Sequence, residues 1–261
     1  MKVLAIMGSP RKRGNGFKVI KRIEERLEAQ QVDFEYYYLK DAGLKMCRGC
    51  FKCILKGEQR CPIKDGRKEL ESMILDADGV IVYSPVYGLN VSGLTKVFID
   101  RFCYAGHHPR FFRQKTLFVA TTCGMGLDGA FRALAYLEDW GFHVVGRLGV
   151  ECPHYALGER KTKKQDRAID QAADDLLAAM SSSRPPTPSF HQIFQYNIMK
   201  TLHNVRPDMK EKFPGDYQYW AERGWLEPST RFFYDTEHHL QHKVYALMVR
   251  AFTRVAAPHM G

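Results

Sequence analysis

The chain has 261 residues, of which 45% are hydrophobic and 26% charged, and its formal net charge at pH 7 is +10. These proportions are ordinary for a soluble globular protein, and no apolar run approaches the roughly 18 to 20 residues that a transmembrane helix needs. The basic excess is spread along the chain, without a recognition helix or zinc-finger spacing, so we expect no nucleic-acid binding. Such a surface does suit anionic small ligands, including cofactors that carry phosphate.

The N-terminus combines one lysine with a short apolar stretch, as a secretory signal does. It continues with Gly-Ser-Pro and basic residues, however, where a signal has a small-x-small cleavage site. We therefore interpret residues 2–8 as a first strand and expect a cytoplasmic protein. Thiols stay reduced there, so clustered cysteines are expected to bind metal or act in redox chemistry rather than form disulfides.

Residues 1–180 alternate between apolar, strand-like stretches and amphipathic, helix-like ones. The predicted strands are residues 2–8, 32–39, 78–88, the first part of 115–126, and 142–152. The predicted helices are residues 17–30, 67–77, 93–104, 131–141 and 163–180. Five apolar strands alternating with helices predict an α/β domain, a doubly wound parallel sheet of five strands with helices on both faces.

The composition changes at residues 181–189, which are rich in serine and proline and suit a linker. Residues 190–261 are too rich in aromatic side chains to be a disordered tail, so we expect a mainly helical extension. Within it, residues 242–257 predict a basic amphipathic helix. Such a helix can lie on an anionic membrane, but packing on its own domain or on a sister subunit is the favoured interpretation.

The first predicted strand leads into the segment GSPRKRGNGF, residues 8–17. Its glycines let the backbone bend closely around a ligand, and the following helix points free amides at the same place. The side chains that add hydrogen bonds or charge are Ser9, Arg11 and Asn15. The loop matches neither the nucleoside-triphosphate motif nor the dinucleotide fingerprint. We interpret it as a phosphate site of another kind, with an ordinary structural turn as the alternative.

Two further strand ends carry glycine-bearing loops that should lie at the same edge of the sheet. The first holds Pro85, Val86, Tyr87 and Gly88, and the second holds Thr121, Thr122, Cys123 and Gly124. Together they suit a flat, mostly apolar ring whose phosphate binds the first loop. We interpret Cys123 as a small residue that fills a turn rather than as a catalytic thiol, and no acid–base residue is predicted.

Four cysteines, Cys47, Cys50, Cys53 and Cys61, lie within residues 46–62, after the second predicted strand. Their spacing, C-x₂-C-x₂-C-x₇-C followed by proline, is close to the spacing that ferredoxins use for [4Fe–4S] ligation. Zinc ribbons instead pair two separated C-x₂-C knuckles. We favour a cluster, with reduced structural thiols as the main alternative and zinc as the third.

Three segments, GSPRKRGN, SPVYGLNVSGLTKVFIDR and TTCGMG with the later LAYLEDWGFHVVG, resemble the NADPH-dependent FMN reductase family of flavodoxin-like proteins. The cysteine loop, CRGCFKCILKGEQRCPIKDG, resembles that of its iron-sulfur flavoprotein branch. The resemblance covers about residues 1–180. It implies that Ser9, Arg11, Asn15 and Gly16 hold the FMN phosphate, and that residues 85–88 and 121–124 hold the flavin ring. Two positions depart from the family, Gly16 in place of Ser or Thr and Asp65-Gly66 in place of two acidic residues.

The resemblance implies an FMN-dependent oxidoreductase that takes electrons from NADH or NADPH. They would pass on, through the cluster where one is present, to a small molecule or a redox protein. One alternative is a cluster-free quinone or xenobiotic reductase, and another is a non-enzymatic FMN electron carrier or redox sensor. Because FMN sites in this family usually lie near a subunit interface, a homodimer or homotetramer is expected, without membrane association.

Overall fold

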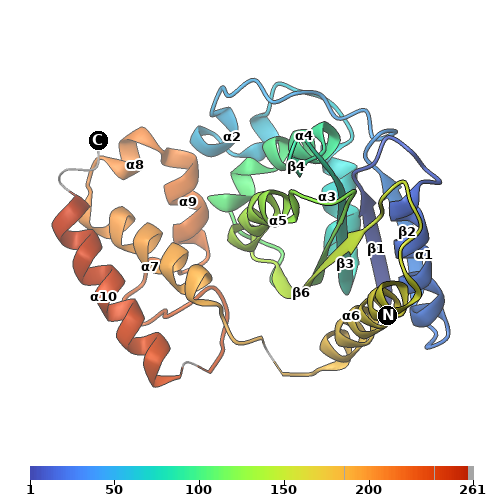
Figure 1. Cartoon of the computed structure of the whole chain (residues 1–261). Coiled ribbons are helices and arrows are strands. Elements are labelled where there is room, and N and C mark those ends of the chain that lie inside the picture. Colours follow the sequence, from blue (N-terminus) through green and yellow to red (C-terminus); the bar gives the residue numbers. More distant parts are fainter. Residues whose placement is uncertain (185, 238, 258–261) are drawn as a thin grey trace.

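A parallel sheet of five long strands organises the N-terminal part of the chain (Figure 1). Its strand order is β2-β1-β3-β5-β6, with every neighbouring pair parallel. The strands are β1 (Lys2–Met7), β2 (Asp33–Tyr38), β3 (Gly79–Tyr87), β5 (Lys115–Thr122) and β6 (His143–Glu151). This confirms the predicted flavodoxin-like α/β fold. The strand order reverses between β1 and β3, which is where such sheets bind ligands.

Helices cover both faces of the sheet, because alternate residues of each strand point to opposite sides. Val3 and Ala5 of β1 join one apolar core, and Leu4 and Ile6 join the other. The first core lies under α1 (Asn15–Glu28) and α6 (Glu159–Ser181). The second lies under α3 (Arg67–Asp76), α4 (Gly93–Arg101) and α5 (Leu127–Ala135).

Two elements differ from the sequence prediction. The helix expected at 131–141 begins at Leu127, and its last part is a 3₁₀ helix, η3 (Tyr136–Trp140), which ends at Gly141 with φ at 101°. The third strand does not end in a simple turn. It turns back through Gly88 and Leu89, both at positive φ, and pairs antiparallel with β4 (Asn90–Val91). The prediction missed this hairpin because leucine rarely adopts the left-handed conformation.

The connection that carries the four cysteines contains two short elements, α2 (Lys52–Leu55) and the 3₁₀ helix η1 (Glu58–Arg60). A third short element, η2 (Cys103–Gly106), follows α4 and lies against this connection. All seven cysteines are free.

The C-terminal extension is helical, as predicted, and has an aromatic core of its own around Tyr196, Trp220 and Trp225. Its helices are α7 (Phe190–Val205), α8 (Met209–Lys212), α9 (Pro214–Glu222) and α10 (Leu240–Ala256). Ser189 and Gln192 form a capping box that starts α7. None of the helices in the described residues is long and apolar enough to cross a membrane.

The structure is a computed structural model and describes residues 1–184, 186–237 and 239–257. Residue 185 of the predicted linker 181–189 lies outside these ranges, as do residues 238 and 258–261 of the predicted extension 190–261. The division of the chain into these three parts stays a prediction.

Candidate functional site

The loop between β1 and α1 presents unpaired backbone amides. Gly14 occupies the N-cap position of α1, and no side chain caps the first turn. The buried Ser9 hydroxyl accepts a hydrogen bond from the Arg11 amide, at 3.1 Å, and so fixes the bend of the loop. The side chains of Arg11 and Asn15 are exposed at the same helix end. Free amides, the helix dipole and a nearby guanidinium are the features that bind a phosphate group.

The absent side chain at Gly16 has a local cause. Gly16 is buried on the ring of Tyr83, from β3, and a Cβ atom at this position would overlap the phenol carbons and hydroxyl. The Tyr83 hydroxyl in turn shares a 2.9 Å hydrogen bond with the Thr121 hydroxyl of β5. A serine or threonine at position 16 is therefore incompatible with Tyr83, and this pair accounts for the departure from the family.

We expect Gly16→Ala to reduce the free energy of unfolding by about 1–3 kcal/mol, because the added methyl group overpacks the contact with Tyr83. Urea unfolding measures this loss, which should be smaller when Gly16→Ala is made in a Tyr83→Val background. Gly124→Ala is the control, since a Cβ at Gly124 meets no atom within 4 Å. Equal losses in the two single variants would contradict the proposed contact.

The three loops predicted to bind the cofactor meet at the carboxyl edge of the sheet. Tyr83 joins the first loop to the end of β5, as described above. The β3–β4 hairpin joins the third loop, because a Cβ on Gly126 would lie 2.7 Å from Val86 and from the backbone of Leu89. The Thr122 hydroxyl donates to the Met125 carbonyl and accepts from the Gly124 amide, which shapes the turn after β5.

The predicted ring-binding residues differ in exposure. Pro85, Thr121 and Thr122 are buried at the strand ends, and Val86 is half-buried. Tyr87, Gly88, Cys123 and Gly124 are exposed around them. Buried strand ends below and exposed loop atoms above form a surface that fits a flat ring. That these residues contact FMN stays a prediction.

The four cysteines for which the sequence predicts a cluster line one small pocket, with a volume of about 80 Å³. Positive φ angles at Gly49 and Phe51 turn the chain sharply, which brings Cys47, Cys50 and Cys53 to the same pocket as Cys61. The Cys47 sulfur accepts a hydrogen bond from the Gly49 amide at 3.5 Å.

A fifth cysteine, Cys103 from η2, lines the same pocket, and the sequence analysis missed it. It lies on a different element, far along the chain from Cys61, so no spacing pattern reveals it. A hydrogen bond from the Cys103 thiol lowers the pKa of Cys53, with a further contribution from nearby Arg67. The same contact, together with burial, raises the pKa of Cys103.

A buried ion pair forms the wall behind the pocket. The Arg101 guanidinium donates to both carboxylate oxygens of Asp65, at 2.9 Å each, and to the Cys61 sulfur at 3.5 Å. Asp65 also accepts the Lys45 amide. The next residue, Gly66, lies against the backbone of Ala42, and a Cβ there would be 2.6 Å from the Ala42 carbonyl oxygen. This contact explains why a second acidic residue is absent at this position.

The donor set fits an iron-sulfur cluster. Five thiols face one pocket, and the guanidinium groups of Arg67 and Arg101 also line it and would offset the negative charge of thiolates. Each thiolate of a [4Fe–4S] cube binds a different iron atom, so the thiolates need not converge on one point. In the part of the chain that the structure describes, no three His, Cys, Asp or Glu side chains form a group able to hold a single metal ion.

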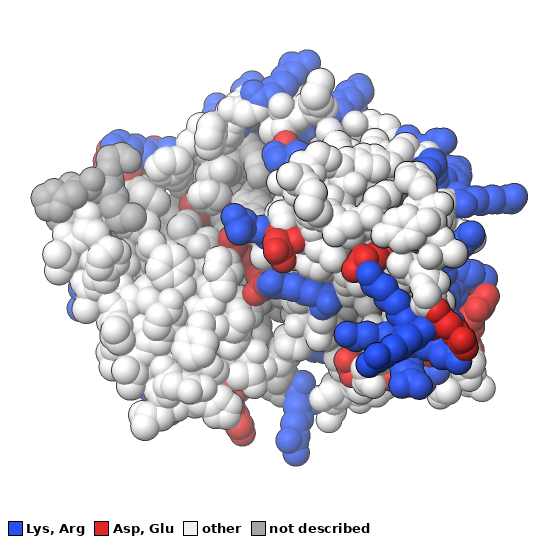
Figure 2. Space-filling model, in the orientation of Figure 1, with Lys and Arg blue, Asp and Glu red and all other residues white. Residues whose placement is uncertain are grey.

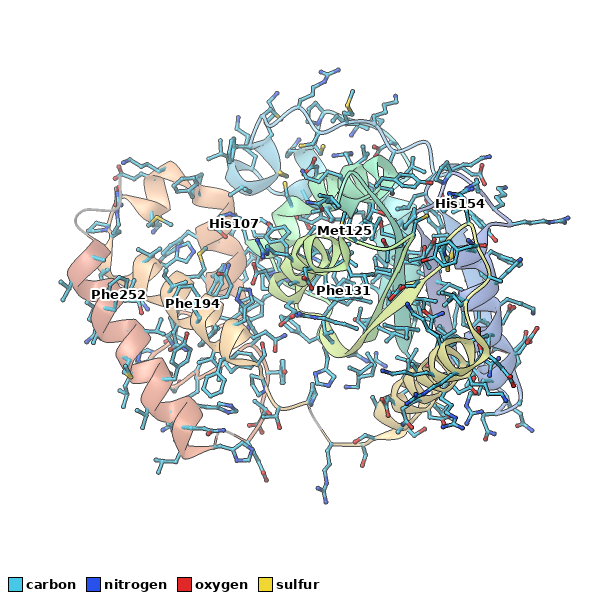
Figure 3. The ribbon with its side chains drawn as sticks, viewed as in Figure 1. His107, Met125, Phe131, His154, Phe194 and Phe252 are labelled. Carbon is cyan, nitrogen blue, oxygen red and sulfur yellow. The ribbon has the colours of Figure 1, made fainter. Side chains whose placement is uncertain are left out.

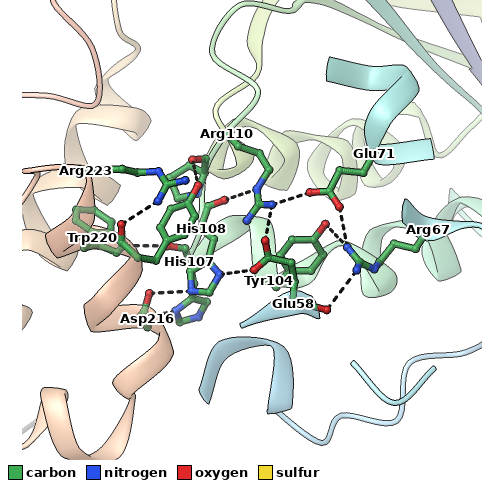
Figure 4. A network of polar contacts seen from close by, with 12 residues as sticks. Glu58, Arg67, Glu71, Tyr104, His107, His108, Arg110, Asp216, Trp220 and Arg223 are labelled. Atoms are coloured by element: carbon green, nitrogen blue, oxygen red, sulfur yellow. Dashed lines mark hydrogen bonds and ion pairs between the residues drawn. The ribbon is translucent and has the colours of Figure 1, made fainter. Parts of the chain in front are cut away.

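A buried polar network connects the cysteine loop to the C-terminal extension (Figure 4). Glu58, between Cys53 and Cys61, pairs with Arg110 at 2.7 Å and with His108 at 3.3 Å. The other ring nitrogen of His108 lies 3.6 Å from Asp216 of α9, and His203 of α7 lies 3.5 Å from the same carboxylate. Arg110 and His108 hold the pKa of Glu58 well below its usual range, although burial opposes this.

The extension also packs directly behind the cysteine loop. Gly215 of α9 lies so close to α2 that a Cβ on it would be 2.6 Å from the Ile54 carbonyl oxygen. Trp220 donates its indole N–H to the His107 carbonyl, and Tyr219 donates its hydroxyl to the Pro109 carbonyl, both at 2.8 Å. The extension therefore braces α2, which carries Cys53, and the segment that follows Cys103.

Comparison with known proteins identifies the family of the chain. The family model described as NADPH-dependent FMN reductase matches residues 1–162. An iron-sulfur flavoprotein of Archaeoglobus fulgidus is 30% identical over 230 residues, which cover 87% of this chain and all of that protein. One from Clostridioides difficile is 27% identical over 232 residues, covering 86% of this chain and 99% of the relative.

Solved structures share the fold at low identity. RosB, solved with 8-demethyl-8-formylriboflavin-5′-phosphate, superposes with a TM-score of 0.56 at 12% identity, covering 69% of this chain and 79% of RosB. A flavone reductase gives a TM-score of 0.54 at 16% identity, covering 70% and 64%. With the family model matching more than half of its length, the chain belongs to the NADPH-dependent FMN reductase family.

Proposed function

We propose that the protein is an NAD(P)H-dependent FMN oxidoreductase that holds a [4Fe–4S] cluster on Cys47, Cys50, Cys53 and Cys61. It would deliver electrons to a small molecule or a redox protein, as a cytoplasmic homodimer or homotetramer. One observation carries the proposal, namely the cysteine-lined pocket in the connection after β2. The 2.6 Å Lys12–Asp41 ion pair joins this connection to residues 8–17, the phosphate loop. The relatives' shared name, iron-sulfur flavoprotein, supports it.

The chemistry that FMN supplies when bound is to accept a hydride from a nicotinamide and to release electrons to a further centre. The chain's own residues would bind the FMN phosphate and orient the flavin ring. The amides at the start of α1 and the Arg11 guanidinium would hold the phosphate. The exposed Tyr87 and the backbone of residues 122–124 would flank the ring, while Arg67 and Arg101 would stabilise thiolates in the pocket.

Anaerobic purification followed by an absorption spectrum and iron and sulfide analysis tests the cluster. We expect brown protein with about four iron atoms per chain. Cys50→Ser should abolish the iron while FMN remains, because the pocket and the phosphate loop are built from separate segments. Cys123→Ser, which alters an exposed thiol outside the pocket, should leave the iron content unchanged. A yellow wild-type protein with FMN and no iron would remove the cluster from the proposal.

Stopped-flow mixing of the purified protein with NADH or with NADPH tests the reductase activity. Rapid bleaching of the flavin absorbance supports the proposed enzyme and identifies the preferred nicotinamide. No bleaching with either nucleotide points instead to a non-enzymatic electron carrier. Bleaching of the flavin in a protein without iron would indicate a cluster-free reductase.

A further inference from the structure

Helix α10 presents a continuous apolar face to solvent. Its outward positions carry six large apolar side chains, each between 48% and 77% exposed, namely Leu240, Val244, Leu247, Met248, Phe252 and Val255. Figure 3 shows Phe252 on the far side of the molecule from His154, and the surface over α7 and α10 is largely uncharged in Figure 2. Isolated exposed apolar residues are normal, but a contiguous patch marks an interaction surface.

The opposite face of α10 is already fixed. His242, Val249 and Thr253 are buried, and Arg250 donates a 2.8 Å hydrogen bond to Asn197 of α7. Phe190, at the start of α7, makes ring contacts with His242 and Tyr245 at 5.0 and 5.3 Å. The helix therefore cannot turn its exposed face inward without losing these contacts, and no described part of the chain covers this face.

The order of the exposed side chains fits a two-fold axis. Val244 and Phe252 stand four residues before and after Met248, and Leu240 and Val255 stand near the two ends of the helix. In an antiparallel pair centred on Met248, Val244 of one copy lies opposite Phe252 of the other. Leu240, near the start of one helix, then lies close to Val255, near the end of the other. A two-fold interface requires this reciprocity. The six side chains offer on the order of 600 Å² per copy, near the roughly 800 Å² of a standard interface.

Charges around the face also favour a second copy. Helix α10 has no acidic residue and carries the exposed Lys243 and Arg254 near its two ends, and the exposed Asp235 and Glu237 precede its N-terminal end. Antiparallel pairing brings Asp235 and Glu237 of one copy toward Arg254 of the other and opposes the two helix dipoles.

We propose that this face of α10 pairs antiparallel with α10 of a second copy of the chain, so that α7 and α10 of two copies form a four-helix assembly. This face of α10 is distinct from the cysteine pocket and the phosphate loop, so the pairing can be tested independently of the enzymatic activity.

Sedimentation velocity of the full chain over a range of protein concentrations tests the pairing. We expect wild type to form a dimer or larger assembly, and Met248→Glu with Phe252→Glu to halve the assembled mass while keeping the circular dichroism spectrum. Leu75→Glu, at an exposed apolar site on α3, is the matched control and should keep the wild-type mass. A monomeric wild type, or an unchanged mass in the double variant, would overturn the proposal.

Oxidative cross-linking tests the orientation. A new cysteine at the two-fold axis lies opposite itself, so Met248→Cys should form a disulfide-linked dimer above the wild-type background on a non-reducing gel, and Leu240→Cys should not. Efficient cross-linking of both would indicate a parallel pair and contradict the register. Flotation with phosphatidylserine-containing vesicles completes the test, since binding by a monomeric wild type, abolished in Met248→Glu with Phe252→Glu, would assign the face to a membrane instead.

Discussion

Replacing Arg101 with methionine should cost about 3–5 kcal/mol of the free energy of unfolding at neutral pH, the largest single-residue effect that we expect. Both side chains of the Arg101–Asp65 pair are almost fully buried, at 2% and 1% exposure. Burial alone would raise the pKa of Asp65, yet hydrogen bonds from Arg101 and the Lys45 amide hold it below its ordinary value of 3.8. Without Arg101 the carboxylate stays buried with no countercharge. Urea unfolding followed by tryptophan fluorescence measures the loss.

Two comparisons make the Arg101 result specific. Arg26→Met removes an exposed bidentate pair with Asp174 and should change the free energy of unfolding by no more than about 1 kcal/mol. Adding Asp65→Asn to Arg101→Met removes the stranded charge while an amide oxygen remains for the Lys45 N–H, so much of the lost stability should return. If the double variant is as unstable as the single one, packing of Arg101 matters more than its charge.

The sheet and the helices of residues 1–180 could be predicted because their patterns are local. Leu4 and Ile6 alternate with Val3 and Ala5, and each set joins a separate core, so β1 is an unbroken apolar run. The helix of residues 242–257 was likewise visible from its spacing. Boundaries were harder where turn chemistry was unusual, as at Leu89, whose positive φ ends β3 in a hairpin.

The candidate site could be predicted only where its residues are consecutive. The phosphate loop and the four-cysteine loop are continuous segments, and the structure brings each together. Cys103, Tyr83 and Asp216 act through contacts with residues distant in sequence, so no local pattern marks them. Gly16 shows this most clearly. The sequence shows only that position 16 lacks a hydroxyl. The fold shows that Tyr83, from another strand, occupies the space that a side chain at position 16 would need.

Asp216→Asn is the second substitution with a large expected effect, about 2 kcal/mol of the free energy of unfolding near neutral pH. The carboxylate is buried among three imidazoles, with His107 at 3.3 Å, His203 at 3.5 Å and His108 at 3.6 Å. Burial raises the pKa of Asp216, but the contacts with His107 and His203 outweigh it and lower the pKa to about 2. An amide in the same place cannot carry the negative charge that these contacts favour.

The pH dependence of this effect follows from the direction of the pKa change. A carboxyl whose pKa is lower in the folded state stabilises the fold above its unfolded pKa, and this contribution disappears as pH falls through the folded value. The difference between wild type and Asp216→Asn should therefore shrink as pH falls between about pH 4 and pH 2. Asp33→Asn, at an exposed carboxylate, should track the wild type.

The Asp216 substitution should also reach the cysteine pocket, because α9 packs on α2 and His108 connects Asp216 to Glu58. Loosening α9 would expose Cys53, so we expect faster alkylation of Cys53 by iodoacetamide in Asp216→Asn, measured by mass spectrometry on the protein without iron. The exposed Cys123 is the internal control and should react at the wild-type rate. Unchanged reactivity of Cys53 in a measurably destabilised variant would show that the extension stabilises the fold without bracing the pocket.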